Sequence, residues 1–127
     1  MSCRMSELIV QCEDAAALAE FWCVVLDYVE LSREEPDDGI EIGPRSGFGG
    51  AAPTLVFSKG PAASSTQLRL HFDVNPVDRD QAAELERLLS LGARPADIGQ
   101  TGTEPWHVLQ DPEGNVFCLL RQQLPEL

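Results

Sequence analysis

Residues 111–120 read Asp-Pro-Glu-Gly-Asn-Val-Phe-Cys-Leu-Leu, a turn that runs directly into an apolar strand. Asp favours the first position of a type I turn, Pro fixes φ at the second, and Gly accepts the positive φ that closes the turn. Such a turn is typical of a three-residue hairpin loop with a bulge. We therefore predict that residues 106–110 pair antiparallel with residues 116–120. The pairing would place on one face Trp106, Val108 and Cys118, and on the other face His107.

Length, charge and composition limit the class of protein. The chain has 127 residues, a net charge of −12 and 43% hydrophobic residues, which predicts one globular domain, residues 1–127. The acidic charge argues against nucleic acid and anionic membranes as partners, and it suits a neutral or cationic ligand or plain solubility. Because no membrane span and no secretory leader are recognisable, we expect a cytoplasmic protein. The four cysteines lack a paired spacing, which favours reduced thiols.

The order of elements is the same in the two halves of the chain: strand, helix and three further strands. The first copy has a helix capped by Asp14, and its strands are expected at 7–12, 28–33, 39–43 and 54–58. The second copy has a helix capped by Asp78, and its strands are expected at 68–74, 93–98, 106–110 and 116–120. The copies lie about 64 residues apart and span about residues 5–60 and 66–124. A unit of this size cannot bury its own sheet, so the copies are expected to pack together.

The first helix has apolar residues at helical spacing, which predicts the face that packs on the sheet. These residues are Leu18, Phe21, Trp22 and Val25. The second helix has Leu85, Leu88 and Leu89 in the same arrangement, with Gly92 as its stop.

The motif Asp-Pro-Glu-Gly-Asn-x-Phe-Cys near the C-terminus resembles the last hairpin of the glyoxalase/bleomycin-resistance/extradiol-dioxygenase superfamily, the vicinal oxygen chelate fold. The repeated element order extends the resemblance over essentially the whole chain. The resemblance implies an α+β fold in which paired βαβββ modules form a cupped, mixed, mostly antiparallel sheet with helices on the outer face. It also implies a small-molecule ligand and a homodimer.

The superfamily's metal ligands lie on the first and last strands of each module. The resemblance carries these positions to Glu7, His71 and Cys118, and the strand at 54–58 offers no ligand. A carboxylate, an imidazole and a thiolate form a set that zinc accepts. Each residue also has an ordinary interpretation: a surface charge for Glu7, a cavity wall for His71 and an inert buried thiol for Cys118.

Two further residues are candidates for contacting a substrate. Arg69 lies on the same predicted face as His71 and could orient an anionic group, or it could pair with Asp73. Trp106 could be a stacking platform or a part of the core. A 2-His-1-carboxylate iron site would need His107 as well. Since His107 is predicted on the opposite face, extradiol oxygenase chemistry is disfavoured.

The sequence therefore predicts a glyoxalase-like protein that acts on or binds a small organic ligand. In the superfamily's metalloenzymes a divalent metal stabilises an enediolate-type anion, which implies lyase- or isomerase-type chemistry with His71 as ligand or general base. The alternative is a metal-free protein that sequesters its ligand, as bleomycin-resistance members do. Because a dedicated metal site wants three or four well-supported ligands, we expect no tightly bound zinc or similar metal.

Overall fold

The computed structural model describes residues 2–35, 38–60 and 70–127. The chain divides into two compact units. The N-terminal unit comprises Ser6–Leu70, and the C-terminal unit comprises Met1–Met5 together with His71–Leu127. No helix among the described residues is long and apolar enough to cross a membrane.

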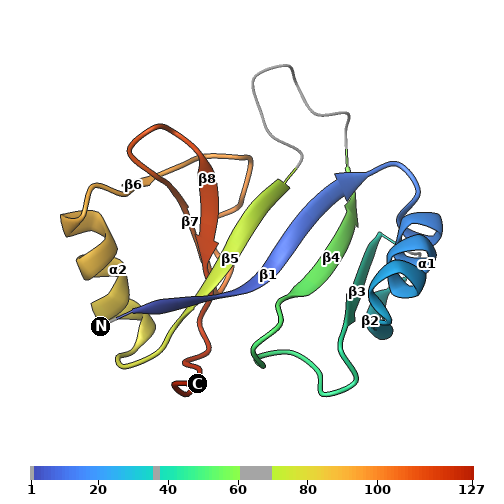
Figure 1. Cartoon of the computed structure of the whole chain (residues 1–127). Coiled ribbons are helices and arrows are strands. Elements are labelled where there is room, and N and C mark those ends of the chain that lie inside the picture. The colour runs from blue at the N-terminus through green and yellow to red at the C-terminus, as the bar shows by residue number, and fades with distance from the viewer. Residues whose placement is uncertain (1, 36–37, 61–69) are drawn as a thin grey trace. The chain divides into compact units, whose positions relative to one another are not determined.

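The predicted element order is confirmed, and the fold is α+β with two βαβββ modules (Figure 1). The first module consists of β1 Cys3–Cys12, α1 Ala15–Leu26, β2 Val29–Glu34, β3 Gly39–Gly43 and β4 Thr54–Lys59. The second consists of β5 Leu70–Pro76, α2 Gln81–Ser90, β6 Arg94–Pro95, β7 His107–Gln110 and β8 Val116–Leu119. β6 is shorter than the strand predicted at 93–98.

Both modules have the same strand topology. The first has the order β2-β3-β4-β1 and the second the order β6-β7-β8-β5. In each, the first strand pairs parallel with the last, and the remaining neighbours pair antiparallel. The sheet is therefore mixed and mostly antiparallel, as predicted.

The core of the N-terminal unit lies between α1 and one face of its strands. Asp14 caps α1 by accepting a hydrogen bond from the Ala17 amide at 3.0 Å. The helix packs on β3 and β4 (Figure 1). Its buried residues are the small Ala15 and Ala19. The buried cluster consists of Ala15, Ala19, Ile40, Ile42 and Phe57. The predicted helix face is wrong in part: Leu18 and Trp22 pack against the core, whereas Phe21 and Val25 are exposed.

The hairpin of the C-terminal unit forms in the predicted register. Val108 pairs with Cys118, and His107 pairs with Leu119 on the opposite face. The turn closes through a hydrogen bond from the Gly114 amide to the Asp111 carbonyl at 2.9 Å, and Gly114 has φ of 87°. Asp111 also accepts hydrogen bonds from Asn115, chiefly through its side-chain amide, which lower the pKa of that carboxyl. The turn that the sequence motif predicted is thus held by its own side chains.

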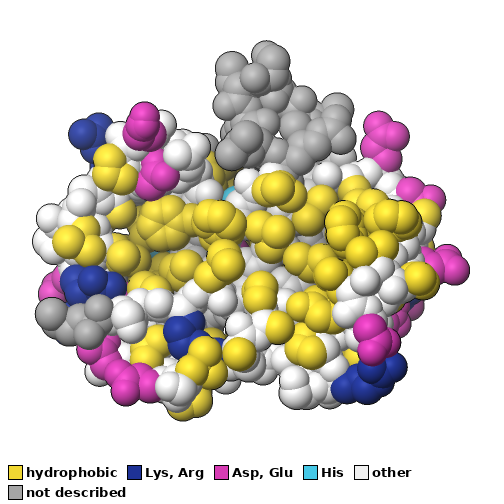
Figure 2. All heavy atoms as spheres, in the orientation of Figure 1, with side chains coloured by type: hydrophobic (Ala, Val, Ile, Leu, Met, Phe, Trp, Pro, Cys, Tyr) yellow, Lys and Arg dark blue, Asp and Glu magenta, His cyan; other side chains and the backbone are white. Residues whose placement is uncertain are grey.

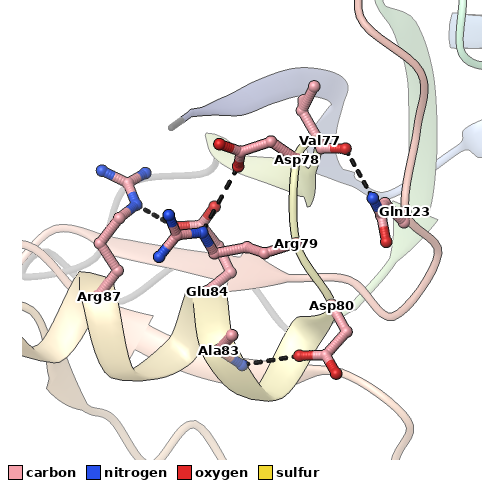
Figure 3. Close-up of polar contacts among 8 residues, drawn as sticks. All are labelled: Val77, Asp78, Arg79, Asp80, Ala83, Glu84, Arg87 and Gln123. Carbon is pink, nitrogen blue, oxygen red and sulfur yellow. Dashed lines mark hydrogen bonds and ion pairs between the residues drawn. The ribbon is translucent and has the colours of Figure 1, made fainter.

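The predicted cap of the second helix is wrong, because α2 begins two residues later than expected. Asp80, not Asp78, accepts the hydrogen bond from the Ala83 amide at 2.9 Å (Figure 3). Asp78 instead lies 3.5 Å from Nε of its neighbour Arg79. The two helix caps are therefore 66 residues apart, and the residue seven positions before the cap in the second module is Asp73 rather than His71.

The C-terminal tail fixes the end of β5. The Leu124 amide donates to the Pro76 carbonyl at 2.9 Å, and the Gln123 side chain donates to the Val77 carbonyl at 2.8 Å (Figure 3). The fully buried Asn75 donates to the Gln122 carbonyl at 2.9 Å. This strand, which carries the candidate site, is therefore anchored on its C-terminal side.

Candidate functional site

The candidate site is built from the parallel pair β5 and β8. Side chains two residues apart on a strand project from the same face, so His71 and Asp73 lie together on β5. Parallel pairing places Asp73 directly beside Cys118 of β8. The pairing therefore brings an imidazole, a carboxylate and a thiol to one place. We call these three residues the His-Asp-Cys cluster.

The three functional groups of the cluster are close enough to share one ligand. Their potential ligand atoms all lie within 4.8 Å of one another. Nε2 of His71 is 3.6 Å from Oδ1 of Asp73. The Asp73 and Cys118 side chains are buried, while the His71 side chain keeps 21% of its surface exposed. Access to the cluster is therefore through His71.

The surroundings favour a neutral imidazole at His71. Burial lowers its pKa below the ordinary value, and the neighbouring Asp73 carboxylate opposes this shift only in part. A neutral imidazole keeps a nitrogen lone pair that can bind a metal ion or accept a proton.

Trp106 does not lie beside His71. It immediately precedes β7, at the end where His107 pairs with Leu119. His71 lies one residue before the Phe72–Phe117 pair, toward the hairpin turn at the other end. The loop before Trp106 is fixed by Glu104, whose pKa is lowered to about 2 by hydrogen bonds from backbone amides, that of Thr101 first. Trp106 itself is 42% exposed, so its role in substrate contact stays a prediction.

The remaining predicted site residues lie elsewhere. Glu7 is on β1 of the N-terminal unit, beside Thr54, and is not a member of the His-Asp-Cys cluster. The Thr54 hydroxyl on β4 donates a hydrogen bond to the carboxylate of Glu41 on the neighbouring strand β3 at 2.8 Å. Arg69 lies outside the described residues. The metal role of Glu7 and the substrate role of Arg69 therefore stay predictions.

Asp73 is the site residue that the prediction of ligands omitted. The sequence contains a signal for it, because the alternation His71-x-Asp73 puts both side chains on one face. The misplaced helix cap concealed a second signal, since Asp73 occupies the position seven residues before the true cap, as Glu7 does in the first module.

The donor set of the cluster fits a divalent metal such as zinc. Zinc accepts imidazole nitrogen, carboxylate oxygen and thiolate sulfur, and catalytic zinc sites use three protein ligands and leave one position open. The cluster supplies one donor of each type from two neighbouring strands. With Asp73 included, the third ligand comes from the same unit as His71 and Cys118, and Glu7 is not needed.

Comparison with known proteins agrees with the fold. A family model described as a glyoxalase-like domain matches residues 7–120. A glyoxalase/bleomycin resistance protein/dioxygenase superfamily member from Vibrio splendidus aligns with 13% identity and a TM-score of 0.57, covering 93% of this chain and 97% of that chain.

Two solved structures with named activities have similar folds. Methylmalonyl-CoA epimerase from Mycobacterium tuberculosis aligns with 16% identity and a TM-score of 0.59, covering 97% of this chain and 87% of that one. The 2,2',3-trihydroxybiphenyl 1,2-dioxygenase from Sphingomonas wittichii aligns with 18% identity and a TM-score of 0.55, covering 98% of this chain and 43% of that one. No curated protein matches the sequence. The chain belongs to the glyoxalase-like domain family.

Proposed function

We propose that the protein acts on a small organic ligand at the His-Asp-Cys cluster, with a divalent metal and lyase- or isomerase-type chemistry. The observation that carries this proposal is the convergence of three different donor atoms within 4.8 Å on two neighbouring strands. The structural relatives support the proposal only in fold, because an epimerase and a dioxygenase share it.

Each residue of the cluster has a distinct part in this proposal. His71, Asp73 and Cys118 would hold the metal, which as a Lewis acid stabilises negative charge that develops on a ligand oxygen. Asp73 and Cys118 are buried and keep bulk water away from the inner side of the site. His71 is partly exposed and lies where a ligand reaches the cluster.

The net charge of −12 narrows the class of ligand. A strongly anionic protein repels anionic molecules at long range, so a neutral or cationic ligand approaches more readily.

Gln110 is a further polar residue on the face of the sheet that carries Cys118, because it follows Val108 by two residues on β7. Its half-buried amide can donate to or accept from a polar group of the ligand.

A second candidate function is metal-free binding of an organic ligand. One observation favours it: Nε2 of His71 lies 3.6 Å from Oδ1 of Asp73, so the nearby carboxylate favours the imidazole tautomer that carries its proton on Nε2, without any metal. In that state the other imidazole nitrogen is the acceptor available to a ligand. A proton on Nε2 and a metal bound by the same nitrogen exclude one another, which makes the two functions separable.

The test is carbon-bound hydrogen exchange with a panel of small 2-oxo and 2-hydroxy carbonyl compounds in D2O, followed by NMR. Zinc bound at the cluster would acidify the hydrogen beside the carbonyl, which then exchanges with solvent water as the proton acceptor and donor, and removal of the metal or His71→Ala should slow this exchange at least about 100-fold. The matched control is His107→Ala, which removes the other histidine of the chain from an exposed position on the opposite face. Exchange that survives His71→Ala, with the fold intact by circular dichroism, would contradict the proposal. Binding of a panel member without exchange would favour the second candidate.

A further inference from the structure

The residues nearest the hairpin turn form one row across β6, β7, β8 and β5. Arg94 of β6 pairs with Gln110 of β7, and Gln110 pairs with Val116 of β8. Val116 and His71 each lie two residues before the pair of cluster residues that joins β8 to β5, so the row ends at His71. Directly paired residues project from the same face of a sheet. We call these four residues the Arg94 row, and it lies on the face that carries the His-Asp-Cys cluster.

Exposure rises along the Arg94 row from the cluster to Arg94. Asp73 and Cys118 of the cluster are buried. His71 and Gln110 are half-buried, and Arg94 is exposed. Neighbouring strands lie about 4.8 Å apart, so three strand spacings place the Cα atoms of His71 and Arg94 roughly 14 Å apart. This distance leaves room for a small ligand whose reactive end reaches the cluster and whose other end lies toward Arg94.

The Arg94 guanidinium is free to bind a ligand. Its side chain has no hydrogen bond or ion pair to any other residue that the structure describes. By contrast, Arg33, Arg45, Arg79 and Arg87 each form an ion pair with a carboxylate. Cations are scarce in this chain, which has nine Lys and Arg against 21 Asp and Glu. Figure 2 shows Lys and Arg side chains as isolated areas on the face in view. An arginine beside the candidate site without an acidic partner is therefore notable.

We propose that Arg94 and Gln110 select a ligand that carries a carboxylate several bonds away from the oxygens that reach the His-Asp-Cys cluster. This inference rests on the proposed function and adds the chemical class of the ligand. The planar guanidinium of arginine binds a carboxylate through two parallel hydrogen bonds, and the Gln110 amide can donate a third. The protein's own neighbouring carboxylate, that of Asp111, is already engaged, because it accepts hydrogen bonds from Glu113 and Asn115 within the turn.

The acidic character of the protein limits such a ligand to a single carboxylate. The net charge of −12 repels anions at long range, and salt screens this repulsion over about 8 Å at physiological ionic strength. The contact between Arg94 and one carboxylate acts within that distance. Each further negative charge on the ligand adds repulsion and finds no second guanidinium in the Arg94 row. A preference for an anionic compound over its neutral analogue would therefore oppose the net charge and require a local cation.

An ordinary structural interpretation of Arg94 makes a different prediction. β6 is the last strand in the order of the sheet, and a charged side chain on an edge strand discourages pairing with another chain. If edge protection is its only role, replacing Arg94 leaves ligand binding unchanged. Arg94→Lys distinguishes the two roles further, because lysine keeps the positive charge that protects an edge and loses the two parallel hydrogen bonds to a carboxylate.

Calorimetric titration of the zinc-loaded full chain with two compounds tests this inference. The compounds 5-hydroxy-4-oxopentanoate and 1-hydroxypentan-2-one share a hydroxyketone, and only the first has a carboxylate at its far end. We expect the carboxylate compound to bind at least about 10-fold more tightly, Arg94→Gln to abolish this preference and Arg94→Lys to keep only part of it. The matched control is Arg121→Gln, which removes the same charge from an exposed position beyond β8 and should leave the preference unchanged.

The outcomes separate this inference from the proposed function. Equal affinity of the wild-type protein for the two compounds would overturn the inference and leave the proposed function standing. The same holds if Arg121→Gln removes the preference as fully as Arg94→Gln does, because the effect would then come from net charge. Failure of the zinc-loaded protein to bind either compound would overturn both. Circular dichroism establishes that each variant is folded, and unchanged binding of 1-hydroxypentan-2-one by Arg94→Gln shows that its cluster is intact.

Discussion

The two units share one strand topology and differ in what they bury. In the N-terminal unit the buried cluster is apolar, with Ile40, Ile42 and Phe57 at its centre. In the C-terminal unit the buried side chains include Asp73, Asn75 and Glu84. Burying charged or polar groups costs stability unless each has a partner. The C-terminal unit therefore depends on the partners of its buried polar groups, such as Gln122 for Asn75 and Arg87 for Glu84, in addition to apolar packing around Leu109 and Leu119.

The largest effect is expected in the apolar core of the N-terminal unit. Phe57 is fully buried, so Phe57→Ala should lower the free energy of unfolding by about 3–5 kcal/mol, measured by chemical denaturation. Phe72 of β5 is 53% exposed, and Phe72→Ala should cost about 1 kcal/mol or less. Equal costs for the two substitutions would contradict the burial of Phe57 in the core of the N-terminal unit and the exposure of Phe72 on β5.

A smaller effect is expected at the buried carboxylate of α2. Glu84 is fully buried and forms an ion pair with Arg87, whose side chain is 21% exposed (Figure 3). Arg87→Met leaves the Glu84 carboxylate without this cation and should lower the free energy of unfolding by about 2–3 kcal/mol. This loss lies at or below the lower end of the range for breaking a fully buried ion pair, because Arg87 is partly solvated.

The double substitution sharpens this prediction. Replacing Glu84 and Arg87 together by Met removes both charges, so denaturation should show recovery of most of the loss that Arg87→Met causes. If Arg87→Met alone changes the unfolding free energy by less than about 0.5 kcal/mol, the ion pair is an ordinary surface feature. The C-terminal unit would then be less dependent on buried polar groups than the comparison indicates.

Much of the fold could be predicted because its signals are local. The turn at Asp111–Gly114 is determined by Pro at its second position and Gly at its fourth. The turn in turn determines the register in which β7 and β8 pair. The Asp14 cap and the repetition of the element order were equally readable. The second cap was misplaced because Asp78 and Asp80 are both suitable N-cap residues, and tertiary contacts decide between them.

The less predictable features depend on pairing between distant segments. The local alternation places Asp73 on the same face as His71, but its position beside Cys118 follows from the parallel pairing of β5 with β8, a contact across more than forty residues. The exposure of Phe21 and Val25 was missed for a related reason. In a helix that is apolar on all sides, periodicity cannot tell which residues face the core of their own chain.

The most direct test of the central claim is the absorption spectrum of the protein titrated with cobalt(II), which replaces zinc and reports its ligands. If the His-Asp-Cys cluster holds the metal, wild-type protein shows a thiolate-to-cobalt charge-transfer band that saturates at one equivalent. Cys118→Ser removes the band, Asp73→Asn weakens cobalt binding about 10-fold or more, and the matched thiol control Cys12→Ser leaves both unchanged. Absence of cobalt binding by folded wild-type protein, or a thiolate band that persists in Cys118→Ser, would contradict the assignment of this cluster as the metal-dependent centre.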